Sequence, residues 1–203
     1  MKNIKSKIIG NQVWITENLT KDQFHDITGR TIPLKNDKWA SSHGPKCYSY
    51  ETNFKFKKKE YLFDLNTVNF FRSFSGEHNT WRIPTLNDLD NLFRNIDGRS
   101  STDYLYEEIA NTLRGNYGWL NNGTNKIGFD ALPNPIINEN GELTELGISR
   151  WWFYDERRGE LGGFGLYQDD IVAFSGIHNY NAFAIRLVMD LHDPRIENNI
   201  IYV

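Results

Sequence analysis

The clearest hydrophobic pattern in the chain follows the segment Trp81-Arg82-Ile83-Pro84. Apolar residues recur there at intervals of three and four, at Leu86, Leu89, Leu92, Phe93 and Ile96. This spacing places them on one face of an amphipathic helix. Thr85 can cap the helix, Asp88 lies near the positive end of its dipole, and Gly98 offers a left-handed stop. The pattern therefore predicts a helix between Thr85 and Gly98.

Two further segments carry helical periodicity. Residues 102–114 predict a second helix, in which Leu105, Ile109 and Leu113 are four residues apart and Gly115 ends the run. Residues 60–72 are rich in apolar side chains, and both a strand period and a helix period fit them.

The remaining hydrophobic segments are short and resemble strands. Residues 8–19 alternate in polarity and suit an early strand. Beyond residue 116 the candidate strands are 127–132, 148–154, 163–167, 171–175 and 182–189. Asn-Gly, Gly-Gly and Asp-Asp turns separate them, as in a meandering antiparallel sheet. The residues therefore predict an α+β fold class, with two helices inside a mostly β, loop-rich domain.

Composition favours one aromatic core. A chain of 203 residues commonly shares a single core, so we expect one domain over residues 1–203. Six Trp, ten Tyr and thirteen Phe indicate that large rings fill this core. A formal charge of -3 gives no reason to expect nucleic acid as a partner. The lysine-rich run 55–59 is expected to be a solvated strand edge, with an anion-binding patch as the alternative.

The sequence carries no evident targeting signal. The lysines of residues 1–10 are not followed by the apolar stretch of about 7–15 residues that a signal peptide needs. No window reaches the roughly 18 apolar residues of a membrane span. We therefore expect a protein without a membrane span that is cytoplasmic as encoded or part of a virion or other assembly. Cys47 is the single cysteine, so no intrachain disulfide can form.

Six short signatures occur in a fixed order along the chain. They are Gly10-Asn11-Gln12-Val13-Trp14-Ile15-Thr16-Glu17-Asn18-Leu19, Trp81-Arg82-Ile83-Pro84-Thr85, Leu113-Arg114-Gly115 followed by Trp119, Gly128-Phe129-Asp130-Ala131-Leu132-Pro133, Trp151-Trp152, and Ala184-Ile185-Arg186-Leu187-Val188-Met189-Asp190. With these signatures the chain resembles the Fibrobacter succinogenes major paralogous domain family over about residues 8–190. Residues 191–203 are then a C-terminal extension.

The resemblance implies a C-type-lectin-like fold, related also to the formylglycine-generating enzyme branch. Such a fold has two helices packed on a twisted, mostly antiparallel sheet, with a long loop region on one side. Relatives in the family are usually secreted or surface-anchored, whereas this sequence has no evident signal. The family also commonly has a cysteine before its Trp-x-x-Pro motif, and residues 76–80 contain none.

The aromatic signatures are expected to be structural. Trp14, Trp81, Trp151 and Trp152 are interpreted as core residues whose indole N–H groups each find one partner. Arg186 lies between two apolar residues of a predicted strand, where its charge requires a carboxylate or several carbonyl groups. We expect a structural ion pair, with Glu17 or Asp155 as open choices of partner, in preference to a ligand contact.

The sequence offers little support for catalysis. Cys47 lies near His43 in sequence, but this proximity does not establish a nucleophile and base pair. The five histidines show no metal-ligand spacing, and turn chemistry explains the acidic segments around residues 139–142 and 169–170. We therefore expect no catalytic residues, no metal site and no cofactor.

Polar and aromatic residues gather between the double-tryptophan strand and the last predicted strand. In a scaffold of this kind loops carry recognition, because the core supports them without depending on their composition. The candidate ligand-binding residues are Tyr154, Asp155, Arg157, Arg158, Tyr167, His178 and Tyr180. Tyrosine and arginine suit such contact surfaces. The alternative is that these residues are ordinary polar loops.

These observations predict a non-catalytic binding module that holds a protein or a glycan on this loop face. It can also be a structural or decoration component of a larger homo- or hetero-oligomeric assembly, such as a phage virion. The alternative is a metal-dependent enzyme of the formylglycine-generating or sulfoxide-synthase type on the same fold.

Overall fold

The structure is a computed structural model that describes residues 4–35, 39, 44–52, 58–78, 81–97, 107–137, 142–144, 147–167, 172–175, 177 and 181–191. Within these ranges the helices lie in the first 113 residues, the last seven strands follow one another, and the sheets are antiparallel, which confirms the α+β class. The described helices are α1 (Lys21–Thr28), α2 (Leu65–His78), α3 (Leu86–Asp97) and α4 (Glu107–Leu113). The expectation of two helices is therefore too low. None of the helices in these ranges is both long and apolar enough to cross a bilayer.

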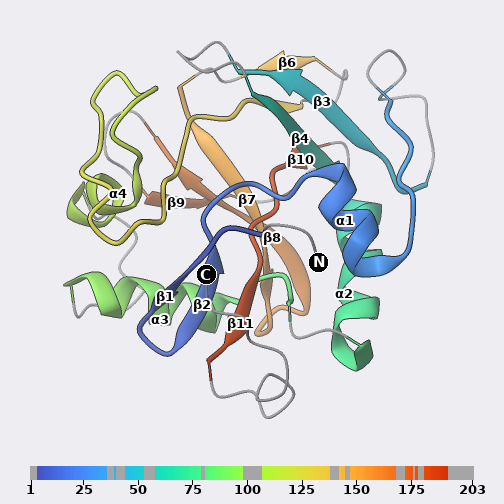
Figure 1. Cartoon of the computed structure of the whole chain (residues 1–203), viewed down its shortest axis with the longest axis horizontal. Helices are drawn as coiled ribbons and strands as arrows, with labels where there is room; N and C mark the ends of the chain where they lie inside the picture. The colour runs from blue at the N-terminus through green and yellow to red at the C-terminus, as the bar shows by residue number, and fades with distance from the viewer. Residues whose placement is uncertain are drawn as a thin grey trace.

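The strands of the described residues form three antiparallel sheets. They are β1 (Ser6–Ile9), β2 (Gln12–Ile15), β3 (Cys47–Glu51), β4 (Lys59–Asp64), β5 (Ile136–Ile137), β6 (Leu143–Thr144), β7 (Ser149–Asp155), β8 (Glu160–Leu166), β9 (Val172–Ser175), β10 (Ala182–Phe183) and β11 (Val188–Asp190). The sheet orders are β1-β2-β11, β3-β4-β10-β5-β6 and β7-β8-β9. The last two strands thus pair with early ones, and Figure 1 shows β11 beside β2.

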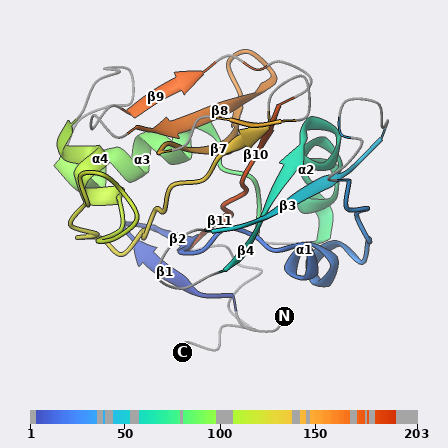
Figure 2. The ribbon, with the colours of Figure 1, turned by 90° about the horizontal axis from the view of Figure 1, so that it is seen from above.

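The sheets enclose two hydrophobic clusters, and several strands, among them β2 and β7, contribute to both. Alternation along β2 sends Trp14 into one cluster and Val13 into the other. Alternation along β7 does the same with Trp151 and Trp152. The two adjacent tryptophans therefore lie on opposite faces of β7, and each packs into a different cluster. In Figure 2, α3 and α4 lie near β7, β8 and β9, whereas α1 and α2 lie at the other end.

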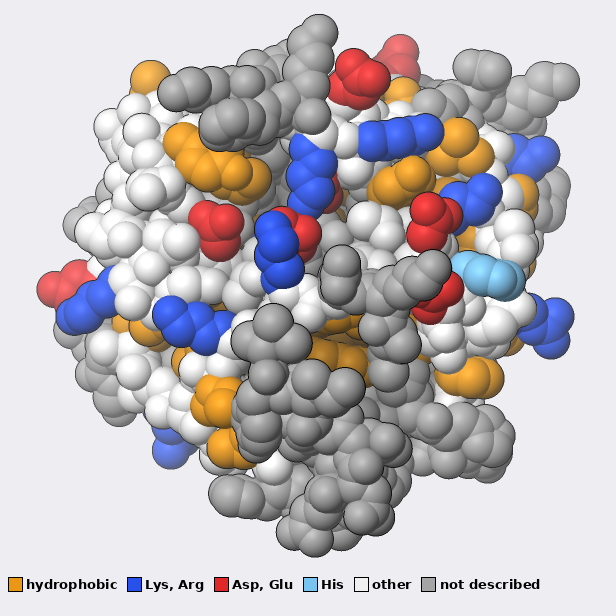
Figure 3. Space-filling view, in the orientation of Figure 1, with side chains coloured by type: hydrophobic (Ala, Val, Ile, Leu, Met, Phe, Trp, Pro, Cys, Tyr) orange, Lys and Arg blue, Asp and Glu red, His pale blue; other side chains and the backbone are white. Residues whose placement is uncertain are grey.

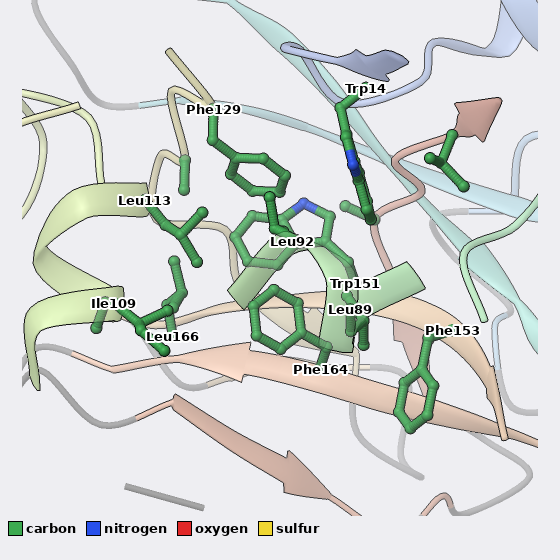
Figure 4. Packing of buried hydrophobic residues seen from close by; sticks show 14 of the residues in the cluster. Trp14, Leu89, Leu92, Ile109, Leu113, Phe129, Trp151, Phe153, Phe164 and Leu166 are labelled. Carbon is green, nitrogen blue, oxygen red and sulfur yellow. The ribbon is translucent and has the colours of Figure 1, made fainter. Parts of the chain in front are cut away.

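The first cluster is built from rings and from the apolar faces of two helices. Leu89 and Leu92 of α3 point into it, as Figure 4 shows. Its rings meet edge to face or tilted, with centroid separations of 5.6–5.9 Å, through Trp14, Phe129, Trp151 and Phe164. These separations lie in the range in which aromatic pairs add to the free energy of burial. The expected aromatic core is confirmed for the described residues.

Helix α3 begins as the sequence predicts. The Thr85 hydroxyl accepts a hydrogen bond from Asp88 N at 3.2 Å, and an Asp88 carboxylate oxygen accepts from Thr85 N at 2.6 Å. This reciprocal arrangement is a capping box in which aspartate takes the place of glutamate. Of the predicted second helix, residues 107–114 lie in the described part of the chain, and α4 occupies Glu107–Leu113.

One open choice is resolved, and two sequence predictions need correction. Residues 60–72 are both elements in succession, because β4 ends at Asp64 and α2 begins at Leu65. Residues 127–132 are not a strand, since Gly128 and Asp130 have φ of 73° and 52° and turn the backbone out of the extended region. The predicted strand 182–189 is divided between β10 and β11, which belong to different sheets.

Helix α1 was not predicted, although its ends carry local signals. Thr20 and Gln23 form a capping box, in which each side chain bonds the other residue's backbone N–H. Gly29 ends the helix at φ 68°, a left-handed conformation that suits glycine. The finer expectation of a C-type-lectin-like arrangement stays a prediction.

Candidate functional site

Part of the predicted ligand-binding set gathers at one end of the β7–β8 hairpin. Tyr154 and Asp155 end β7, and Arg157 and Arg158 lie in the turn that leads to β8. Tyr167 follows β8 at the opposite end, beyond seven cross-strand pairs, which corresponds to about 20 Å at 3.3 Å per residue. The structure therefore does not bring Tyr167 to the turn. His178 and Tyr180 lie outside the described residues.

The turn is held in one conformation by its own hydrogen bonds. The backbone oxygen of Asp155 accepts from Arg158 N at 3.2 Å and from Gly159 N at 2.8 Å. The Asp155 carboxylate accepts from Arg157 N at 3.0 Å. Gly159 has φ 70°, which a side chain would strain. Asp155 thus organises the turn, a role for which it is largely buried.

The carboxylate of Asp155 stays ionised because of these bonds. Partial desolvation raises its pKa, but the hydrogen bonds and charge of Arg157 outweigh that effect and leave the pKa below its ordinary value.

The turn is also fixed to the start of α3. Tyr154 N donates to the Pro84 carbonyl at 2.8 Å, and the two Glu156 carboxylate oxygens accept from Leu86 N at 3.0 Å and Asn87 N at 3.1 Å. These are N–H groups of the first helical turn, where a negative charge is stabilised by the helix dipole. Sequence reasoning missed Glu156, since nothing local indicates that a turn residue will cap a helix seventy positions earlier.

The outer side of this turn carries arginine and tyrosine. Arg157 and Arg158 side chains are 58% and 74% exposed. The guanidinium carbon of Arg72, from α2, lies 3.4 Å from the centre of the half-buried Tyr154 ring, a close cation–π stack. We call these four residues, Arg72, Tyr154, Arg157 and Arg158, the hairpin-turn surface.

The opposite end of the hairpin has a different arrangement. The Tyr167 hydroxyl accepts from Arg150 Nη2 at 2.9 Å, and the Arg150 guanidinium also lies over the Phe183 ring at 6.0 Å. Asn134 Oδ1 accepts from Arg150 N at 2.8 Å. Asn181, which borders the same end, donates to the Ile137 carbonyl. Tyr167 is thus part of a packed polar cluster.

The four signature tryptophans are buried, so their interpretation as core residues is confirmed. Their exposed fractions are between 1% and 6%. The indole N–H of Trp14 donates to Gln12 Oε1, that of Trp151 to Asn18 Oδ1, and that of Trp152 to the Phe63 carbonyl.

The predicted ion pair of Arg186 is wrong. Arg186 is 2% exposed, and its guanidinium donates to the carbonyl oxygens of Phe129 and Asp130 and to Asn18 Oδ1. It also stacks on the Phe129 and Trp151 rings, at 4.3 and 5.3 Å. Carbonyls and π-faces replace the carboxylate because the left-handed turn at residues 128–130 aims two carbonyl groups inward. Burial lowers the pKa of Arg186 to about 10, so it stays charged at neutral pH.

The described residues include one candidate nucleophile, Cys47, and its surroundings disfavour reaction. Cys47 is fully buried, and desolvation raises the pKa of its thiol to about 11, which disfavours the thiolate. His43 lies outside the described residues. Within the described ranges, no group of three or more His, Cys, Asp or Glu side chains is arranged to hold a metal ion. Residues 55–57 of the lysine-rich run 55–59 also lie outside them.

Comparison with known proteins identifies the scaffold. A family model described as the Fibrobacter succinogenes major domain matches residues 8–189. The chain belongs to the Fibrobacter succinogenes major domain family. The match covers both hydrophobic clusters and ends within β11. No curated protein and no solved structure gave a match. Family membership therefore accounts for the signatures. The ligand of this Fibrobacter succinogenes major domain has to be inferred from its surface.

Proposed function

We propose that this protein is a non-catalytic binding module, on a C-type-lectin-like scaffold, that holds a protein or a glycan through the hairpin-turn surface. The observation that carries the proposal is the contrast between a fixed turn and exposed arginines. Asp155 fixes the turn from within, because its backbone and carboxylate oxygens accept three backbone N–H groups, and Glu156 fixes it from the α3 side, because its carboxylate accepts two. A preorganised surface binds with a smaller loss of conformational entropy.

The arginines are available for exchange with a ligand. Arg158 contacts Asp155 at 3.8 Å and Glu160 at 3.6 Å, and Arg157 contacts Asp155 at 3.3 Å. The arginine end of each pair is exposed, so solvent screens these contacts and each contributes about 0–1 kcal/mol. A ligand carboxylate, phosphate or hydroxyl can replace them at little cost, while the Tyr154 and Arg72 stack supplies a flat amphipathic contact.

A role in a larger assembly is a second form of the same proposal. β1 and β6 are edge strands of their sheets, and each carries an exposed apolar side chain, Ile8 at 46% and Leu143 at 40%. Such edges can pair with a neighbouring chain, as in a virion component. Light scattering after size exclusion tests this form: a defined oligomer supports it, and a monomer at all concentrations contradicts it.

The binding proposal is tested with one double variant and one matched control. Arg157→Ala/Arg158→Ala removes both exposed guanidinium groups of the turn. Arg94→Ala is the control, because Arg94 is also 58% exposed and ion-paired, but lies on α3. Wild type and both variants are applied to a glycan array and to fractionated cell-surface and virion proteins. We expect the double variant alone to lose about tenfold in affinity for the captured ligand.

Three outcomes contradict the proposal. Unchanged binding by the double variant excludes the turn, equal loss in both variants indicates a nonspecific charge effect, and absence of any bound protein or glycan excludes the module. The enzymatic alternative is tested separately by metal analysis of purified protein. Copper or iron at one equivalent favours it, and protein free of both metals counts against it.

A further inference from the structure

Charged side chains are paired differently at the hairpin turn and elsewhere on the protein. Lys5, Glu17, Lys58 and Glu60 form a row in which successive ammonium and carboxylate groups lie 2.8, 3.4 and 3.0 Å apart. Figure 3 shows basic and acidic side chains similarly interspersed over one face of the molecule. Neighbouring charges of opposite sign cancel at a distance, so such a surface gives a charged partner little long-range attraction.

Two carboxylates at the hairpin turn are instead occupied by backbone N–H groups. The Asp155 carboxylate accepts from Arg157 N at 3.0 Å, and the Asp155 side chain is 11% exposed. The Glu156 carboxylate accepts from Leu86 N and Asn87 N at the start of α3. Backbone donors and the helix dipole stabilise these negative charges. Each charge is therefore compensated largely within the protein.

The two arginines of the turn retain capacity to bind a partner. Salt bridges of 3.3 and 3.8 Å join Arg157 and Arg158 to Asp155, and one of 3.6 Å joins Arg158 to Glu160. A charge-assisted N–H···O bond measures about 2.7–2.9 Å, so these contacts are long. Each guanidinium also carries five N–H donors. A partner's carboxylate can therefore form shorter bonds to these groups than the salt bridges of the turn.

A third guanidinium lies against the same turn. The Arg72 guanidinium carbon is 3.4 Å from the centre of the Tyr154 ring. The Tyr154 hydroxyl oxygen is 3.9 Å from the position that a Cβ on Gly159 would occupy. Because Gly159 directly follows Arg158, these contacts join Arg72 to the turn that carries Arg157 and Arg158. Three guanidinium groups thus border one surface.

The shape of this surface favours a protein partner over a saccharide. Residues 156–160 are all exposed, as expected of a projecting turn. Sites for small ligands are concave and cover most of the ligand. In addition, Arg72 covers one face of the Tyr154 ring, and the ring packs against the second hydrophobic cluster. The ring therefore leaves little free face on which a sugar could stack.

An acidic residue among the arginines favours the same class of partner. The Glu160 side chain is 63% exposed and lies 3.6 Å from Arg158. A polyanionic glycan carries charges of one sign only, so this carboxylate repels it. A protein segment can instead place acidic residues opposite the arginines and a basic residue opposite Glu160. The mixed charges of the turn therefore match a polypeptide better than an acidic glycan.

We propose that the hairpin-turn surface binds an acidic segment of a partner protein, an inference that rests on the binding function proposed for this turn. Aspartate or glutamate side chains of the partner accept paired hydrogen bonds from the guanidinium groups of Arg157 and Arg158. Arg72, held on the Tyr154 ring, meets a further carboxylate. A basic residue of the partner lies opposite Glu160.

The test begins with a displayed library of random peptides, selected on the wild-type protein. Enriched peptides are synthesised with a fluorescent label, and their affinities are measured by anisotropy at low and at physiological salt. A heparin hexasaccharide and a trimer of galacturonic acid are measured by calorimetry. The variants are Arg157→Ala/Arg158→Ala and Arg157→Lys/Arg158→Lys. Arg94→Ala is the control, because Arg94 is also 58% exposed but lies on α3.

We expect the enriched peptides to contain Asp and Glu above their frequency in the library and to bind more weakly at higher salt. The alanine double variant should lower their affinity about tenfold. The lysine double variant should lower it less, because lysine keeps the charge but loses the bidentate fork. Arg94→Ala should bind as the wild type does.

The outcomes separate this inference from the binding function of the turn. The inference alone fails if peptides without an excess of Asp and Glu bind through the two arginines, or if only the acidic saccharides do. Both fail if acidic peptides bind the alanine double variant as tightly as wild type, or if neither peptide nor saccharide binds. An equal loss of affinity in Arg94→Ala indicates nonspecific charge attraction and also overturns the inference.

Discussion

Replacing Asp88 by alanine tests whether a buried carboxylate stabilises the first family signatures. Asp88 is 2% exposed and accepts hydrogen bonds from three residues. Gln12 Nε2 donates at 2.6 Å, Thr85 N at 2.6 Å and the Thr85 hydroxyl at 2.9 Å. Arg82 donates from both terminal nitrogens, Nη2 at 2.8 Å. The carboxylate thus links β2, the Trp-Arg-Ile-Pro-Thr segment and α3.

The expected loss of stability has two parts. Losing the cap of α3 costs about 1 kcal/mol. Leaving the Arg82 guanidinium and the Gln12 amide without their buried acceptor costs about 3 kcal/mol, the lower end for a broken buried pair, because Arg82 keeps Asp190. The sum is about 4 kcal/mol, a large part of the roughly 5–15 kcal/mol that separates folded from unfolded states.

Urea unfolding followed by tryptophan fluorescence measures this loss. Asp190→Ala is the matched control, because Asp190 also binds Arg82, at 3.0 Å, but its side chain is 54% exposed. The control should lose less than about 1 kcal/mol. Both variants should show the wild-type slope against urea, since the surface exposed on unfolding is unchanged. A loss below about 1 kcal/mol for Asp88→Ala would refute the reasoning.

Three further predictions follow from burial, backbone space and charge. Native Cys47 should not react with a thiol reagent at pH 8, since its pKa is raised to about 11 by burial, and should react fully in urea. Gly123→Ala should lower the melting temperature, because a Cβ there would lie 2.4 Å from the Arg114 carbonyl oxygen. Desolvation raises the pKa of Glu17, but the Lys5 hydrogen bond and other cationic contacts outweigh it and leave the pKa below 4.5. The ion-pair contribution is therefore present above about pH 4.5 and disappears as pH falls through the folded pKa. Glu17→Gln should lose less than about 1 kcal/mol at pH 7, and the difference from wild type should vanish at low pH in urea titrations.

The features that the sequence predicted well are those decided within a few residues. The start of α3 needs only Thr85 and Asp88, three positions apart, followed by apolar residues at helical spacing. The strand around Trp151 and Trp152 follows from alternation, which also explains why adjacent tryptophans serve different cores. Local chemistry determines such elements before any tertiary contact is made.

The features that the sequence predicted poorly depend on distant partners or on backbone conformation. Periodicity could not reveal that Asp130 adopts φ 52°, which ends the predicted strand and turns carbonyl groups toward Arg186. For the same reason, the sequence led to the wrong prediction that Arg186 forms an ion pair with a carboxylate. A buried cation needs compensating oxygen atoms, and carbonyls 56 and 57 positions earlier supply them as well as a carboxylate would.

The polar surfaces also differ in whether their residues are close together or far apart in sequence. Tyr154, Arg157 and Arg158 lie within five consecutive positions, so a prediction of one surface needed only the turn that connects two strands. The ion-paired row of Lys5, Glu17, Lys58 and Glu60 unites three separate stretches of chain, and no local pattern indicates that Glu17 and Lys58 will pair. Sites assembled from distant segments become visible only in the fold.

One hydrogen-bonded residue explains why the signatures predict fold and not ligand. Asn18, from the first signature, accepts from Trp151 of the double-tryptophan strand and from Arg186 of the last signature. Three signatures separated by up to 168 positions therefore meet at one amide, which is buried. A sequence that retains Asn18, Trp151 and Arg186 retains the contacts that join these three signatures. Arg157 and Arg158 lie outside the signatures, and their side chains are 58% and 74% exposed, so they can change without disturbing the cluster. The scaffold and the binding surfaces are thus separable, and substitution at the surfaces is the direct way to find the ligand.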